Sequence, residues 1–118
     1  MAEKYEADAE YEVGTVLSFG GDNEVTISNE YLDHRIAGVV SEFPGFLMNK
    51  TMEHGTTVAL RGRIPCKVFG DIKKGDLLVS NGNGRACAVE PLEARAGTII
   101  GKSLEDFSGD EGIIEIVV

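Results

Sequence analysis

One stretch of the sequence decides the expected fold: Arg61-Gly62-Arg63-Ile64-Pro65-Cys66-Lys67-Val68-Phe69-Gly70-Asp71-Ile72-Lys73-Lys74-Gly75-Asp76-Leu77-Leu78-Val79-Ser80. Ile64, Cys66 and Val68 alternate with polar residues and a proline, which is the period-two pattern of a strand with one buried face. The segment 73–76 contains a glycine and an aspartate suited to a turn, and a second apolar run follows it at once. We therefore predict that these two strands form a hairpin, and that the fold is all-β.

Length and composition indicate one ordinary globular domain. The chain has 118 residues, of which 42% are hydrophobic and 26% are charged. A chain of this size folds around a single core without metal or disulfide support. The formal net charge of −9 argues against nucleic acid and anionic membrane as partners, because both require a basic surface. The sequence shows no signal peptide and no long apolar run, so we expect a soluble protein made in the cytoplasm.

Apolar runs separated by glycine-rich turns continue along the chain. We divide it into an N-terminal arm, residues 1–12, and a single β domain, residues 13–118. Nine strand-like runs are expected, at 13–19, 24–28, 35–40, 56–60, 63–68, 77–79, 85–89, 97–104 and 113–118. The run 35–40 is apolar enough to be covered on both faces, and Gly101 is a candidate bulge. About eight or nine short strands with regular turns indicate a small β-barrel or β-sandwich.

Three features favour particular local structures. Asn81-Gly82-Asn83-Gly84 is a strong hairpin signal. The apolar C-terminal run must pair inside the molecule, since a free edge of this kind would aggregate. The apolar patch Phe43–Met48 lies in the longest stretch without alternation, where it either plugs a barrel end or contacts another chain.

The residues that could bind a metal ion or take part in catalysis do not form a recognisable site. His34 and His54 have no ligand at metal-binding spacing, and Cys66 and Cys87 are expected to be buried free thiols. Two acidic turns, at 22–24 and 106–111, lack the ligand order of a calcium loop. No activated nucleophile motif or phosphate loop is present. We therefore assign no catalytic, cofactor-binding or metal-binding residues, expect no cofactor, and predict that the chain is not an enzyme.

A series of phrases resembles a known group of phage proteins. They are Ala-Glu-Lys-Tyr-Glu-Ala-Asp-Ala-Glu-Tyr-Glu-Val-Gly-Thr-Val-Leu (2–17), Arg-Ile-Ala-Gly-Val-Val-Ser (35–41), Val-Ala-Leu-Arg-Gly-Arg-Ile-Pro-Cys-Lys-Val (58–68), Lys-Lys-Gly-Asp-Leu-Leu-Val (73–79), Gly-Thr-Ile-Ile-Gly-Lys-Ser-Leu-Glu-Asp (97–106) and Gly-Ile-Ile-Glu-Ile-Val-Val (112–118). Together they resemble the C-terminal β domain of tailed-bacteriophage tail fibre, spike and appendage proteins. The opening is similar to phage intramolecular-chaperone domains, and the later phrases to small capsid-decoration proteins.

The resemblance implies a virion structural protein, in the tail fibre or appendage or in capsid decoration, that acts in assembly. It also implies a homo-oligomer, with a trimer favoured, that contacts other virion proteins and is located in the virion after synthesis in the host cytoplasm. A self-processing chaperone peptidase is an alternative, but Met1 stands where self-cleaving relatives have a junction serine. A carbohydrate-binding fibre tip is a further alternative, which the absence of Trp disfavours.

Overall fold

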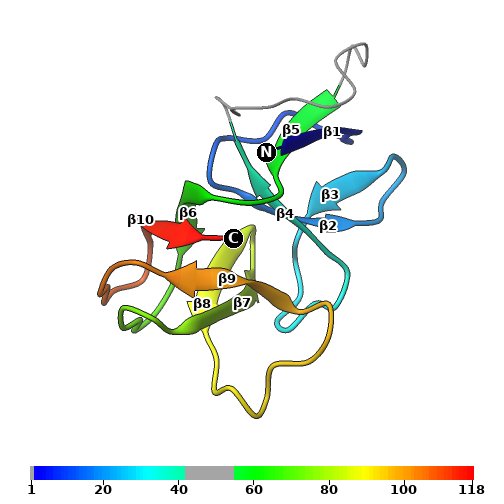
Figure 1. The fold of residues 1–118 in the computed structure, drawn as a ribbon. Helices are drawn as coiled ribbons and strands as arrows, with labels where there is room; N and C mark the ends of the chain where they lie inside the picture. Colours follow the sequence, from blue (N-terminus) through cyan, green and yellow to red (C-terminus); the bar gives the residue numbers. More distant parts are fainter. Residues whose placement is uncertain (1, 42–54) are drawn as a thin grey trace.

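The computed structural model describes residues 2–41 and 55–118, and these form ten strands and no helix. The strands are β1 (Ala2–Glu6), β2 (Val16–Phe19), β3 (Val25–Ile27), β4 (Ile36–Val40), β5 (Gly55–Ala59), β6 (Arg63–Val68), β7 (Leu77–Gly82), β8 (Arg85–Ala88), β9 (Ile99–Ser103) and β10 (Gly112–Val117). They build two five-stranded sheets that lie one above the other in Figure 1. The predicted all-β class is therefore confirmed.

The amino-terminal sheet has the strand order β1-β5-β4-β2-β3. Its two outer strands meet, because Ala7, just after β1, forms a parallel bridge with Val25 of β3. The backbone N–H of Glu24 also donates to the carbonyl of Glu6 at 2.9 Å. The sheet therefore curls around a small core of its own, formed by Leu17, Val25, Val40 and Val58.

The carboxy-terminal sheet is a closed barrel with the order β10-β6-β8-β7-β9. Strand β10 pairs with β6 over six residues and with β9 near its end, so the C-terminal run is paired internally as predicted. Inward-facing Ile64, Cys66 and Val68 of β6 lie in the barrel core, as the alternation in the sequence indicates. Neighbouring pairs are antiparallel except β6 with β8, which is parallel.

Three strands of the amino-terminal sheet are buried on both faces. In β2, Val16 belongs to the barrel core and the next residue, Leu17, to the core of the amino-terminal sheet. Val39 and Val40 divide in the same way in β4, as do Ala59 and Val58 in β5. Since successive side chains point to opposite faces, the sheet seals its own core and also packs on the barrel. This confirms the expectation that the run 35–40 is covered on both sides.

The predicted hairpin between 63–68 and 77–79 is wrong. Strand β6 pairs with β10 and β8, whereas β7 pairs with β8 and β9. The turn itself exists, since Asp76 accepts a hydrogen bond from the backbone N–H of Lys73 at 2.9 Å. Before it, however, Ile72 bridges to Phe107, which carries the chain away from β6. Closure of the barrel therefore prevails over the local turn signal.

Residues 2–6 form a strand where the sequence analysis expects an irregular arm. Strand β1 pairs with β5 over its full length, from Ala2 opposite Ala59 to Glu6 opposite Gly55. The acidic sequence has little intrinsic preference for a strand, and a neighbouring strand supplies the backbone partners. With β1 the count reaches ten strands instead of eight or nine. The patch Phe43–Met48 lies outside the described residues.

Other local predictions are confirmed. Strands β2 and β3 form the first hairpin, and β7 and β8 form the hairpin around Asn83 and Gly84. The bulge expected at Gly101 occurs beside it, where the register of β7 with β9 skips Ile100. Gly101 also lies against the carbonyl of Val117, so a Cβ at this position would overlap backbone atoms.

We expect Gly101→Ala to lower the free energy of unfolding by about 2–4 kcal/mol, because backbone atoms of β10 must move to admit the methyl group. Urea denaturation measures the change. Gly75→Ala is the control: Gly75 has a φ of +92° and open space around a Cβ, so it carries backbone strain alone, about 1–2 kcal/mol. An equal or smaller effect at Gly101 would contradict the predicted overlap.

Candidate functional site

The residues that the sequence singled out for possible chemistry lie apart. His34 is exposed in the loop before β4, and His54 lies outside the described residues. The cysteines are free, with Cys66 buried and Cys87 half-buried, so the prediction of two buried thiols holds fully only for Cys66. Their strands are neighbours, but Val68 pairs with Ala86, which sets the two cysteines three residues out of register. That offset is about 10 Å along the strands, too far for a disulfide.

The thiols are poorly suited to nucleophilic chemistry. Burial raises the pKa of Cys66 to about 12 and that of Cys87 to about 11. Since the thiolate is the reactive form, both side chains stay protonated and unreactive near neutral pH. Both cysteine side chains therefore act as packing residues.

Carboxylates of the two acidic turns accept hydrogen bonds from the backbone. Glu24 accepts the backbone N–H of Glu6 at 2.8 Å, and Asp106 accepts that of Lys74 at 2.8 Å. Within residues 2–41 and 55–118, no three His, Cys, Asp or Glu side chains are grouped to bind a metal. In the same part of the chain, no helix has the length and apolarity needed to cross a membrane.

A buried row of hydroxyl groups was not anticipated from the sequence. Ser18 of β2 lies 2.8 Å from Ser28, measured between their Oγ atoms, and Ser28 lies 2.8 Å from Ser80 of β7. All three residues are buried. At one end of the row, the backbone N–H of Gly82 donates to Ser80 Oγ at 3.1 Å. At the other end, Ser18 Oγ lies 2.8 Å from the carboxylate of Asp33.

The carboxylate fixes the direction of these hydrogen bonds. An ionised Asp33 can only accept, so Ser18 uses its single proton to donate to it. Ser28 then donates to Ser18, and Ser80 donates to Ser28. The result is a one-way chain from the Gly82 amide to the Asp33 carboxylate, in which each bond polarises the next.

Asp33 is 4% exposed and ionised in this arrangement. Burial by itself would raise the pKa of Asp33, but hydrogen bonds from the Arg35 backbone N–H, from Ser18 and from the Arg35 guanidinium outweigh it. The pKa of Asp33 therefore lies below its ordinary value of 3.8. The Arg35 backbone N–H and Nε lie 2.9 and 3.2 Å from Asp33 Oδ1.

This polar junction, the row Ser18, Ser28, Ser80 and Asp33, ties the barrel to the amino-terminal sheet. Backbone hydrogen bonds lie beside it: the N–H of Gly84 donates to the carbonyl of Ser28 at 2.9 Å, and the N–H of Leu32 donates to the carbonyl of Ser80 at 3.0 Å. The hairpin of β7 and β8 is thereby held against the amino-terminal sheet. A polar contact of this kind has directional demands, so it fixes one arrangement of the two sheets where apolar packing alone would allow several.

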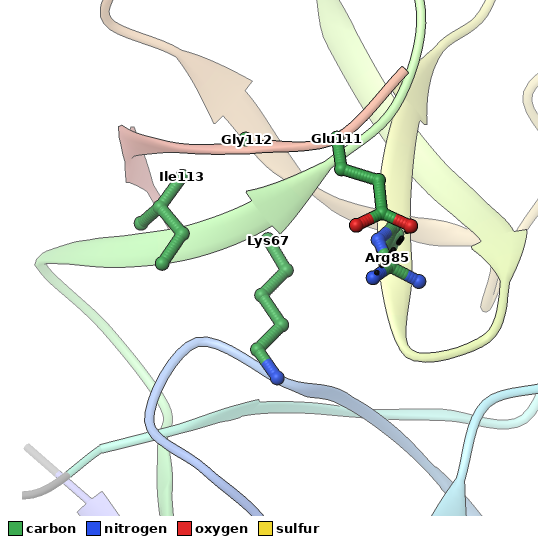
Figure 2. A pocket seen from close by; sticks show the side chains of 5 residues that line it. All are labelled: Lys67, Arg85, Glu111, Gly112 and Ile113. Atoms are coloured by element: carbon green, nitrogen blue, oxygen red, sulfur yellow. Dashed lines mark ion pairs between the residues drawn. The ribbon is translucent and has the colours of Figure 1, made fainter.

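A shallow groove lies on the outer face of the barrel, bounded by Lys67, Arg85, Glu111, Gly112 and Ile113, with a volume of about 300 Å³. Figure 2 shows the side chains of Lys67, Arg85 and Ile113 on three adjacent strands, with Glu111 just before β10. Lys67 of β6 is opposite Ile113 of β10, and the parallel register places Arg85 of β8 beside Lys67 on the other side. Two cations and an exposed isoleucine therefore stand in one row.

Each cation of the groove has an acidic partner that is far more exposed than itself. Lys67 Nζ lies 3.0 Å from Glu12, with side-chain exposures of 21% and 85%. Arg85 lies 3.2 Å from Glu111, with exposures of 24% and 68%. The cations are thus more buried than the carboxylates, and ion pairs of this exposed kind contribute little to stability.

Asp33→Asn is expected to lower stability at neutral pH by about 2–4 kcal/mol, because a buried, fully hydrogen-bonded carboxylate is lost. Its folded pKa is lowered, so this stability is present above the unfolded pKa of about 3.9 and declines as pH falls through the folded value. Denaturation from pH 7 to pH 2 should show the variant losing less stability than wild type.

Asp110→Asn is a matched control, since Asp110 is exposed. The control variant should follow the wild-type pH profile. If Asp33→Asn also follows it, the carboxylate does not carry the junction.

The fold and the site define an all-β module of two curled sheets joined by a polar junction. Neither the family models nor the curated proteins that were searched match this chain. Among solved structures, the chain is similar to the N base of the head fiber protein gp8.5 of bacteriophage phi29, with a TM-score of 0.57 and 17% sequence identity. The match covers 100% of this chain and 92% of that one. At this identity the similarity shows a shared fold.

Proposed function

We propose that this chain is a structural protein of a bacteriophage virion, acting as a fibre, appendage or capsid-decoration module. The observation that carries the proposal is the fold match along the whole chain to the base of a phage head fiber. The phrases of the sequence that resemble phage fibre and decoration domains point independently to the same class. The protein would be made in the host cytoplasm and then incorporated into the particle.

The arrangement of the strands suits such a role. The barrel is closed, and in the amino-terminal sheet one parallel bridge between Ala7 and Val25 joins the two outer strands. Closed sheets avoid uncontrolled edge-to-edge association, so contact with other proteins falls to side chains on the outer faces. Such a module works by shape and surface chemistry, and we propose that it acts without catalysis.

Immunogold labelling of intact virions tests the proposal. Antibodies against the purified chain should mark particles of the phage that encodes it at a defined position, on the head or the tail. Antibodies preadsorbed with the purified chain are the control. Labelling confined to unassembled protein in the lysate, with clean virions after purification, would overturn the assignment.

We also propose that the chain forms a homo-oligomer, with a trimer as the favoured state. Phage fibres and spikes, which the sequence resembles, commonly require repeated copies, and several large apolar side chains on the described surface are exposed, among them Ile113 at 61% and Val117 at 41%. Multi-angle light scattering at micromolar concentration should give about three times the chain mass of 12.7 kDa. A clean monomer under these conditions would contradict self-association.

A further inference from the structure

The two parts of the chain differ strongly in charge. Residues 2–41 and 55–60 contain nine acidic and two basic residues, a formal charge of −7, whereas residues 61–118 contain nine and eight, a charge of −1. The amino-terminal sheet is therefore acidic, and the barrel is close to neutral. Two copies approaching each other sheet to sheet would repel, while sheet to barrel is the less unfavourable orientation.

The turn between β2 and β3 forms an acidic tip with an apolar anchor. Asp22, Asn23 and Glu24 are exposed at this turn, and Phe19 at the end of β2 is 42% exposed. The Phe19 ring packs edge-on against Tyr5, with centroids 5.3 Å apart. This contact fixes the ring before any partner arrives, which lowers the entropic cost of using it in an interface.

The groove of the barrel has the complementary chemistry. Lys67 and Arg85 are largely buried, their carboxylate partners are far more exposed, and Ile113 is exposed beside them. The tip combines carboxylates with an aromatic side chain, and the groove combines cations with an aliphatic side chain. The β2–β3 hairpin and strand β10 lie on opposite sides of the molecule (Figure 1), so one chain cannot bring its own tip to its own groove.

We propose that the β2–β3 tip of one copy docks on the Lys67–Arg85–Ile113 groove of a second copy. This inference rests on the proposed self-association. Phe19 would cover Ile113, and Asp22 would pair with the two cations. The contact is head-to-tail, so each copy offers one tip and one groove. The rotation between these surfaces decides how many copies close into a ring.

Charge reversal tests this contact by sedimentation velocity. Lys67→Glu and Asp22→Lys should each weaken self-association by about tenfold, because each places like charges in contact. The double variant Lys67→Glu/Asp22→Lys should recover the wild-type assembly, since the opposite charges are then exchanged. Lys73→Glu, an equal charge change in an exposed turn outside the groove, is the control and should leave assembly unchanged.

The outcomes separate the contact from the proposed function. If wild type forms oligomers and Lys67→Glu assembles normally, the groove assignment is overturned while self-association stands. The contact is also overturned if both single variants weaken assembly and the double variant does not restore it. If wild type is a monomer, both self-association and this contact are wrong. Ile113→Ser, at a well-exposed position, provides the same test without a charge change if Lys67→Glu fails to fold.

Discussion

The row of hydrogen bonds that runs from the Gly82 amide through Ser80, Ser28 and Ser18 to Asp33 links strand β7 of the barrel to the amino-terminal sheet. The ionised carboxylate can only accept, and this one constraint sets the direction of every bond back to the Gly82 amide. The groups are buried, so a missing member would leave its neighbours without partners or water. Each bond contributes only about 0.5–1.5 kcal/mol net. Their main effect is geometric, because all of these hydrogen bonds form together only when β7 lies in one position against the amino-terminal sheet.

Apolar packing supplies the larger share of the stabilisation around this junction. Strands β2, β4 and β5 separate two cores, and their alternate side chains contribute to each. Burial of a valine or leucine side chain stabilises a fold by about 1.5–3 kcal/mol. A strand covered on both faces makes that contribution at successive residues. The amino-terminal sheet and the barrel are therefore one packed unit, although each has its own core.

Closure leaves the outer surface as the place where this protein can differ from others of the same fold. The inward residues of β6 and β10 must be apolar to pack in the barrel core, whereas the outward row of Lys67, Arg85 and Ile113 is free of that constraint. On this outer surface, Lys67 and Arg85 each pair with a carboxylate that is far more exposed than the cation.

Local patterns in the sequence determined the strands but not their partners. Alternation in 63–68 and the apolar run 35–40 predicted which residues are buried, because a strand's side chains alternate whatever it pairs with. Turn chemistry predicted the hairpin at Asn81–Gly84 for the same local reason. The tertiary structure alone decided that β6 pairs with β10 and β8, that residues 2–6 form a strand, and that three serines distant in sequence form a hydrogen-bonded row ending at Asp33. Those outcomes depend on barrel closure and on contacts between segments far apart in the chain, and no short pattern encodes them.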